Sequence, residues 1–537
     1  MTGPAPWGPV ATLIDVLIER QTDSPDRPAL ADEQGRLTYA ELWSTAGRLA
    51  GGLRAAGIKT GQRVLVMMDN HVDNAVLWVA TAYAGGVHIS LNTGYYGPLL
   101  GEQLRASRAR VVCADAAYLA ALAPWLAEVR PAALVVRGRF DPAAVPAVAG
   151  MRVLDWASVN AADPVPPHRP QPWELAEVRF TSGTTGPSKA VLISHAHAYR
   201  HASPVFPGSI GPDDVNLVAL PLFHLAGTWA LVYNAFTVGA QSVIVDRFSV
   251  SKFWDQVRRH GATHTILLGV MAEFLYRQPA RPDDADNPLR LAYTMPVREW
   301  YADFERRFGL RLYTCFGSTE AGQPIFAVPG TLVPGSCGVA RPEYDVALVD
   351  EHDQPVEVGQ PGELVVRPRQ PWTTMLGYDA MPAESAQVWR NLWLHTGDLF
   401  RRDEQGRFFF IDRVRDAIRR RGENISAAEV ESQITTHPAV AAVAVVGVDS
   451  EFAEQEVMAV VVPADGAKLT PYELLEFLSG RLPKFMLPRY VQFRTDLPRT
   501  PTGKVRKAEL REQGVTGDTW DRERAGAPRS TQGGQRR

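Results

Sequence analysis

The chain has 537 residues and a formal net charge of −3, and 45% of its residues are hydrophobic and 21% charged. This length exceeds one ordinary domain, so we expect one large domain with a smaller one, or three domains. The composition is that of a soluble globular protein, and the balanced charge gives no electrostatic reason to expect nucleic acid or an anionic membrane as a partner.

The cysteines and the N-terminal residues indicate a cytoplasmic protein. Cys113, Cys315 and Cys337 are far apart and form no CxxC pair, which fits neither a disulfide framework nor a zinc site. The first residues lack a basic stretch followed by an apolar core, so we expect no signal peptide. The most apolar long run, residues 75–91, is interrupted by glycines and a histidine and falls short of a membrane span.

Short apolar runs alternate with amphipathic helical segments through most of the chain. This alternation predicts an α/β fold with largely parallel sheets. The runs expected to form strands include residues 63–68, 109–115, 132–138, 241–248 and 263–269.

The character of the sequence changes near residue 412, where charged residues become dense and a helix begins. Two apolar strands follow, then a helix at 471–481 and a strand around YVQF, which together predict a compact α+β module. The tail lacks apolar periodicity and is expected to be disordered. We therefore expect domains at 1–412 and 413–516, and a disordered segment at 517–537.

The stretch FTSGTTGPSKAV, residues 180–191, combines glycines, hydroxyl residues and a lysine. Its spacing is not that of a Walker A loop, because Gly183 and Gly186 are only two residues apart and Lys189 follows at the wrong distance. Glycines that let backbone N–H groups point inward, hydroxyl donors and a lysine still suit an anion. The alternative is a polar surface turn between strands.

Further blocks follow this loop in order: PLFHLAG at 221–227, YTCFGSTEAG at 313–322, NLWLHTGDLF at 391–400, IDRVRDAIRRRGENIS at 411–426 and PRTPTGKVRK at 498–507. In order and spacing they resemble the adenylate-forming superfamily, which includes acyl-CoA synthetases, peptide-synthetase adenylation domains and firefly luciferase. The C-terminal third is most similar to the carnitine/crotonobetaine–CoA ligase and medium-chain acyl-CoA ligase branch. The resemblance implies a large N-terminal adenylation domain with a small β-barrel-like subdomain, and a small mobile C-terminal domain.

The resemblance also implies an ATP site. Glu320 and Thr184 would share Mg²⁺, a hard cation that prefers oxygen ligands. Phe316 would stack on adenine, and Asp398 and Arg413 would contact the ribose hydroxyls. The full set expected to bind cofactors is Thr181, Ser182, Gly183, Thr184, Thr185, Gly186, Lys189, Phe316, Gly317, Thr319, Asp398, Arg413, Gly422 and Lys504. Taken singly, Glu320 is an ordinary surface glutamate and Asp398 an Asx-turn residue.

Lys504, His224, Thr184 and Glu320 are the catalytic candidates that the resemblance implies. Lys504, in a loop bounded by proline and glycine, would stabilise charge between the carboxylate and the α-phosphate. His224 would border the acyl and phosphate sites, although a lone histidine among apolar residues is more often a core residue. The small domain would rotate about Arg415, and Gly422 would line the pantetheine tunnel.

The chain departs from the family pattern where relatives place Gly-Gly-Ala-Pro before the glutamate block. Here the residues are AYTMPVREW, so Tyr293 and Met295 replace small residues, and Trp229 follows His224 on an expected pocket helix. Large aromatic rings fill much of a small pocket. The substrate pocket of His224, Trp229, Tyr293 and Met295 therefore predicts a small or short acid, unless these rings pack into the core.

These features predict an ATP-dependent, AMP-forming enzyme that activates a small acid as an acyl-adenylate and forms a thioester with CoA. The alternative is a secondary-metabolism enzyme with a carrier protein or an amine as acceptor, including one that adenylates nitrite for diazotisation of an arylamine. A catalytically silent binding module is a third interpretation. We expect ATP, Mg²⁺ and CoA as cofactors and a monomer or a homodimer.

Overall fold

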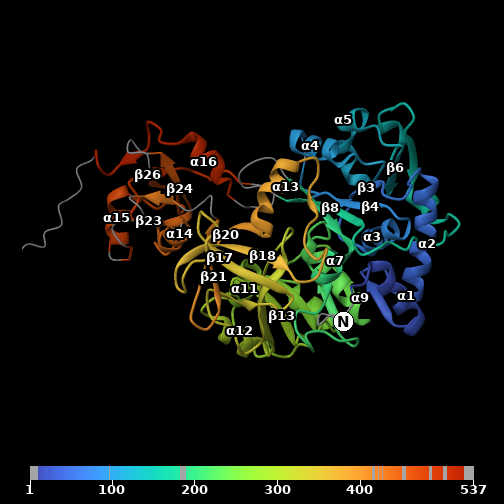
Figure 1. Ribbon diagram of the computed structural model, residues 1–537, viewed down its shortest axis with the longest axis horizontal. Coiled ribbons are helices and arrows are strands. Elements are labelled where there is room, and N and C mark those ends of the chain that lie inside the picture. Colours follow the sequence, from blue (N-terminus) through green and yellow to red (C-terminus); the bar gives the residue numbers. More distant parts are fainter. Residues whose placement is uncertain are drawn as a thin grey trace, which may run out of the picture.

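The computed structural model describes residues 10–95, 97–181, 189–413, 418–420, 423–425, 427–449, 455–479, 481–482, 486–499 and 505–524. Figure 1 shows that the elements after residue 418 gather at one end of the molecule, apart from the earlier sheets and helices. No helix in these described ranges is both long enough and apolar enough to pass through a bilayer.

An eight-stranded sheet, in the order β19-β9-β8-β4-β3-β5-β6-β7, forms one half of the large domain. Its core strands pair in parallel, whereas β8–β9 and β9–β19 are antiparallel. The strands are β3 (Arg63–Met67), β4 (Val87–Ser90), β5 (Val111–Asp115), β6 (Ala133–Arg137), β7 (Arg152–Asp155), β8 (Leu175–Thr181), β9 (Lys189–Ser194) and β19 (Gly377–Tyr378). The helices between them are α2 (Tyr39–Ala55), α3 (Val72–Tyr83), α4 (Gly97–Ser107), α5 (Leu119–Val129), α6 (Trp156–Asn160) and α7 (His195–Ala202), with η1 (Ala116–Tyr118) and η2 (Pro142–Ala144).

A thirteen-stranded sheet forms the other half, in the order β17-β18-β20-β21-β16-β15-β14-β13-β12-β10-β11-β1-β2. Its parallel part holds β1 (Pro28–Ala31), β10 (Val215–Val218), β11 (Gln241–Ile244), β12 (His264–Leu268), β13 (Leu291–Met295) and β14 (Arg311–Ser318). The antiparallel strands are β2 (Arg36–Thr38), β15 (Gly322–Ala327), β16 (Ser336–Ala340), β17 (Tyr344–Val349), β18 (Pro361–Pro368), β20 (Leu394–Arg402) and β21 (Phe408–Arg413). Apart from β2, these strands continue the sheet from β14, where the small β-rich subdomain was expected.

The helices that accompany this second sheet include a π-helical turn, η3 (Thr228–Tyr233), between α8 (Leu225–Gly227) and α9 (Asn234–Val238). Such π-turns are rare and occur frequently at functional sites. The others are α1 (Leu13–Asp23), α10 (Phe253–His260), α11 (Gly269–Tyr276), α12 (Tyr301–Phe308), α13 (Pro382–Val388) and η4 (Arg390–Leu392). The expected α/β class with parallel sheets is confirmed.

The C-terminal elements form a small α+β unit with its own apolar core. They are β22 (Ile418–Arg420), β23 (Glu423–Ile425), α14 (Ala427–Thr435), β24 (Val440–Asp449), β25 (Gln455–Pro463), α15 (Pro471–Ser479), β26 (Tyr490–Phe493), α16 (Lys507–Gln513) and β27 (Trp520–Asp521). Where a disordered tail was expected, β27 pairs with β26. The Trp520 ring lies 5.1 Å from that of Tyr472, and Asp521 forms an ion pair with Arg489. These two contacts order a short strand whose sequence has no apolar periodicity.

A charged pair lies inside the large domain, on β8. Glu177 and Arg179 are 2% and 5% exposed and pair at 2.6 Å. The other oxygen of Glu177 accepts hydrogen bonds from the indole N–H groups of Trp78 and Trp229, at 2.9 and 2.8 Å. Arg179 also donates to the carbonyl of Phe223 at 3.1 Å. Buried charges are tolerated only with partners of this kind, so β8, α3 and η3 are held together by this pair.

We expect Glu177→Ala to destabilise the large domain by about 3–5 kcal/mol, because it leaves the Arg179 charge buried without its carboxylate. A lower midpoint of urea unfolding, followed by circular dichroism, measures this loss. Asp246 is the control, because its pair with Arg247 is exposed and 3.9 Å long, and Asp246→Ala should change the stability by less than about 1 kcal/mol. Equal midpoints for the two variants would contradict the structural importance of the Glu177 carboxylate.

Candidate active site

The glycine- and hydroxyl-rich loop connects two strands that pair with each other. Strand β8 ends at Thr181 and β9 begins at Lys189, and these two residues are partners in the antiparallel register. The Thr181 hydroxyl donates to the Lys189 carbonyl at 3.3 Å. The expected phosphate contacts Ser182, Gly183, Thr184, Thr185 and Gly186 lie outside the described residues. The pairing of β8 with β9 therefore holds the two ends of the loop side by side.

Lys189 and Glu320 come together around Tyr378. The Lys189 ammonium lies 4.5 Å from the centre of the Tyr378 ring, and the Tyr378 hydroxyl donates to Oε1 of Glu320 at 3.3 Å. The pairing of β19 with β9 sets this arrangement, because it places Tyr378 opposite Val191. Each contact is favourable, one as a cation–π interaction and the other as a charge-assisted hydrogen bond. Sequence reasoning missed Tyr378, since a short strand so distant along the chain has no local signal.

A cavity of about 110 Å³ is lined by Gly317, which belongs to the same motif as Glu320. It reaches the motif of Glu320 through Gly317 and the segment after His224 through Leu225 and Ala226. Its lining residues are His201, Ser203, Val205, Ser209, Ile210, Leu225, Ala226, Ala230, Asn234, His264, Ile266, Leu268, Tyr293, Tyr313, Cys315, Gly317 and Gln323. Concave sites with mainly apolar walls and a few polar groups are typical of small-molecule binding.

The bulky residues expected in the pocket take different places. Tyr293 lines the cavity, and its hydroxyl donates to the carbonyl of Cys315 at 3.0 Å. Trp229 is 0% exposed and is not among the lining residues. Its ring lies 5.3 Å from that of His201, so it supports a lining residue from behind. Met295 ends β13, half-buried, and does not line this cavity either.

His224 immediately precedes the lining residues Leu225 and Ala226 and is exposed. Its ring lies 4.6 Å from that of Phe223, whose carbonyl accepts the hydrogen bond from Arg179. The buried pair on β8 thus holds the backbone beside His224.

Three more of the expected contacts lie at the end of β14 and in the turn that follows it. Phe316 is 7% exposed, and its ring packs edge-on against that of Phe400 at 4.7 Å. At Gly317 a Cβ atom would lie 2.4 Å from the carbonyl oxygen of Gly322, so only glycine fits without a backbone shift. Thr319 lies, half-buried, in the turn that follows β14. The wall of the cavity at Gly317 therefore depends on a glycine.

Asp398 lies on β20, is 2% exposed and pairs in register with Arg413 on β21. Only the backbone of Arg413 is described, and its side chain is not. The Asp398 N–H donates to the hydroxyl of Thr396 at 3.2 Å. Residues 395–397 belong to β20, at a bulge in its pairing with β18 where Gly397 has a φ of +70°. This β20 bulge directly precedes Asp398.

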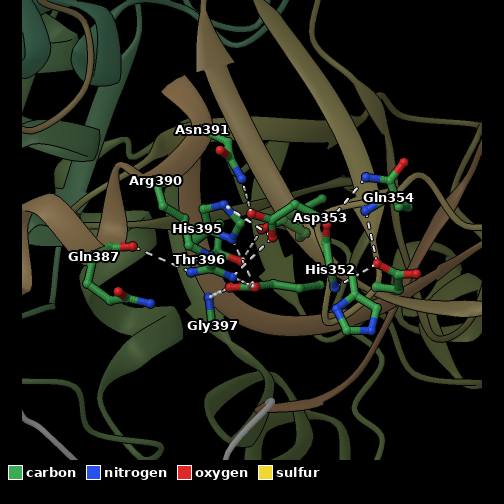
Figure 2. Close-up of polar contacts among 12 residues, drawn as sticks. His352, Asp353, Gln354, Gln387, Arg390, Asn391, His395, Thr396 and Gly397 are labelled. Carbon is green, nitrogen blue, oxygen red and sulfur yellow. Dashed lines mark hydrogen bonds and ion pairs between the residues drawn. The ribbon is translucent and has the colours of Figure 1, made fainter.

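Glu363, on β18, supports the β20 bulge. It accepts hydrogen bonds from the Gly397 N–H at 3.0 Å and from His395 at 2.9 Å, and it pairs with Arg390 at 2.8 Å. Burial alone would raise the pKa of Glu363, but the His395 hydrogen bond and the neighbouring positive charge outweigh it and lower the pKa. Figure 2 shows Arg390 and His395 beside Asp353, which forms ion pairs with both at 3.4 and 3.8 Å. Sequence reasoning identified Asp398 but not this support.

Several expected residues cannot be placed. Lys504, Arg415 and Gly422 lie outside the described residues, so their roles stay predictions. Within the described ranges there is no cluster of three or more histidine, cysteine or acidic side chains that could hold a metal ion. Glu320 alone still fits Mg²⁺, because this ion is usually held by one or two carboxylates together with substrate phosphates and water.

Comparison with known proteins agrees with this geometry. Residues 17–379 match the AMP-binding enzyme family and residues 429–504 match the AMP-binding enzyme C-terminal domain. The crotonobetaine/carnitine–CoA ligase of Escherichia coli O157:H7 is 31% identical over 494 residues, covering 89% of this chain and 93% of the relative. That of Salmonella typhimurium is 29% identical over 502 residues, with the same coverage.

Solved structures extend the similarity over nearly the whole chain. ATP-bound MatB from Rhodopseudomonas palustris superposes with a TM-score of 0.79 at 27% identity, covering 94% of this chain and 99% of that one. MenE from Bacillus subtilis, an o-succinylbenzoate CoA synthetase in complex with its acyl-adenylate, gives 0.80 at 26% identity, covering 93% and 99%. Because the family match spans well over half of its length, the chain belongs to the AMP-binding enzyme family, within the adenylate-forming superfamily.

Proposed function

We propose that the chain is an ATP-dependent, AMP-forming acid–CoA ligase that acts on a small carboxylic acid. In the first step a carboxylate oxygen attacks the α-phosphorus of ATP and pyrophosphate leaves. In the second step the CoA thiol attacks the acyl carbon, and AMP leaves with the carboxylate oxygen that had attacked the phosphorus. The observation that carries this proposal is the convergence of Lys189, Tyr378 and Glu320, together with a cavity that Gly317 of the same motif as Glu320 lines.

Each of these residues has a role that its chemistry supports. Lys189 would place its charge against the phosphates at the end of the loop, with Tyr378 fixing its direction. Glu320 would hold Mg²⁺, which supplies charge neutralisation at the phosphates when bound. Asp398, next to the β20 bulge that Glu363 supports, would accept hydrogen bonds from the ribose hydroxyls. Catalysis would then consist largely of positioning and charge stabilisation.

Product analysis tests the proposal directly. The purified chain would be incubated with ATP, Mg²⁺ and a panel of small acids, with and without CoA, and the panel would include carnitine because relatives carry its name. We expect acid-dependent pyrophosphate release, an acyl-adenylate by mass spectrometry without CoA, and an acyl-CoA with it. Turnover that requires nitrite with an amine, or a carrier protein, and ignores CoA would contradict the proposal and support the alternative acceptors.

We predict that Glu320→Gln lowers the rate of acid-dependent pyrophosphate release by about 10²–10³-fold, because it removes the negative oxygen that holds the metal against the phosphates. The loss should shrink as the Mg²⁺ concentration is raised. Exposed Glu299 provides the matched control, and Glu299→Gln should leave the rate and its Mg²⁺ dependence unchanged. A Glu320→Gln enzyme with the wild-type Mg²⁺ dependence would refute a metal-binding role.

We predict that Lys504→Ala separates the two half-reactions. It should slow formation of the acyl-adenylate by at least about 100-fold, because charge at the α-phosphate would lose its cationic partner. Conversion of a supplied acyl-adenylate and CoA to the thioester should be nearly unchanged. Lys468→Ala, at an exposed lysine of the same small domain, is the control and should affect neither step. Equal losses in both half-reactions would rule out a role confined to adenylation.

A further inference from the structure

The cavity beside Gly317 differs in charge from the nucleotide side of the site. Among its lining residues, all of which are described, there is no aspartate, glutamate, lysine or arginine. Its polar groups are neutral side chains set among aliphatic and tyrosine walls. An ionised group placed in such surroundings without a counter-charge is strongly disfavoured. The part of a ligand that enters the cavity must therefore be uncharged.

Three lining residues hold a buried polar atom without a hydrogen-bond partner. These atoms are Nδ1 of His201, Oγ of Ser209 and Oε1 of Gln323. Other polar residues of the wall are satisfied: His264 contacts the Tyr313 hydroxyl at 2.9 Å and Asn216 at 2.8 Å. A buried polar atom left unpaired is destabilising, and nearly all such atoms in proteins are paired. The cavity thus offers hydrogen bonds that the protein itself does not use.

His201 and Gln323 form a pair with a definite capacity. Nε2 of His201 and Nε2 of Gln323 lie 3.3 Å apart. Burial first, and then the nearby His197, Arg341 and Arg179, lower the pKa of His201 well below its usual value, so the ring is neutral. If the amide nitrogen donates, the histidine proton is on Nδ1 and Gln323 Oε1 is the free acceptor. If the amide is flipped, donor and acceptor exchange places. Either way, one donor and one acceptor remain.

We propose that the acid activated by this enzyme carries a neutral hydrogen-bonding group, a hydroxyl or an aromatic amine, which His201 and Gln323 recognise. A hydroxyl both donates and accepts, and so it matches the donor and acceptor that this pair leaves open. The inference rests on the proposed function, because it names the class of acid. The space of about 110 Å³ is smaller than an apolar cavity of about 150 Å³ that admits benzene, so a long chain or a fused ring system does not fit inside it.

Acids matched in size test this inference. Each pair differs only by a hydroxyl in place of a methyl group: 3-hydroxybutanoate with 3-methylbutanoate, and the hydroxybenzoates with the methylbenzoates at each ring position. Aminobenzoates, benzene dicarboxylates and carnitine complete the panel. We expect at least one acid with a hydroxyl group or an aromatic amino group to exceed its methyl counterpart by about 10-fold or more in kcat/KM for pyrophosphate release. A site built for a hydrogen bond rejects the analogue that lacks it.

Gln323→Met removes the amide with little change in volume and should abolish that preference while preserving or raising kcat/KM for the methyl acid. Gln256 is the matched control, because it is also buried with an unpartnered Oε1 but lies on α10, away from the cavity. Gln256→Met should keep the wild-type preference. Circular dichroism of both variants shows whether the fold is retained.

Calorimetric binding of the same acids separates this inference from the proposed function. Pyrophosphate release that favours methyl, dicarboxylic or permanently charged acids, or a preference that survives Gln323→Met, would overturn the inference and leave the proposed function standing. Tighter binding of the hydroxyl acid without pyrophosphate release from any acid would overturn the proposed function and support the neutral polar subsite. A chain that shows neither pyrophosphate release nor selective binding would overturn both the inference and the proposed function.

Discussion

The buried pair of Glu177 and Arg179 on β8 connects the two sides of the candidate active site. Glu177 fixes the Trp229 indole, which supports the His201 wall of the cavity, and Arg179 holds the Phe223 carbonyl beside His224. The same strand ends at Thr181, where the loop that we expect to bind phosphate begins. Charges that cannot be solvated demand fixed partners, so this pair imposes one geometry on the nucleotide side and the acid side together.

The two sides use different physical means. On the side where we propose that the nucleotide binds, charged groups converge: Lys189 and Glu320 around Tyr378, and Asp398 next to the β20 bulge supported by Glu363. This arrangement suits a polyanion, whose phosphates are the same whichever acid is activated. The cavity on the acid side has neutral polar groups instead. Specificity for the acid then depends on hydrogen bonds and size rather than on charge, so the acid side can differ from that of a relative while the nucleotide side stays alike.

The sequence was sufficient to predict the α/β class, several strands of both sheets and the small C-terminal unit, because these follow from local apolar patterns. Motif spacing also singled out Lys189, Glu320 and Asp398. Tyr378 and Glu363 were missed, since they reach the site through strand pairing across long stretches of chain, which no local pattern encodes. For the same reason an apolar pattern could not decide whether Trp229 lines the pocket or supports it. Nor could it predict that Trp520 lies in a strand paired with β26.

The central claim is that the carboxylate of a small acid attacks the α-phosphorus of ATP within this site. Transfer of oxygen isotope tests it most directly, with an acid labelled with ¹⁸O in its carboxylate and CoA as the acceptor. The account predicts one labelled oxygen in the AMP, because the attacking oxygen stays on phosphorus when the thiol displaces AMP. Unlabelled AMP, or label recovered in inorganic phosphate, would contradict the account.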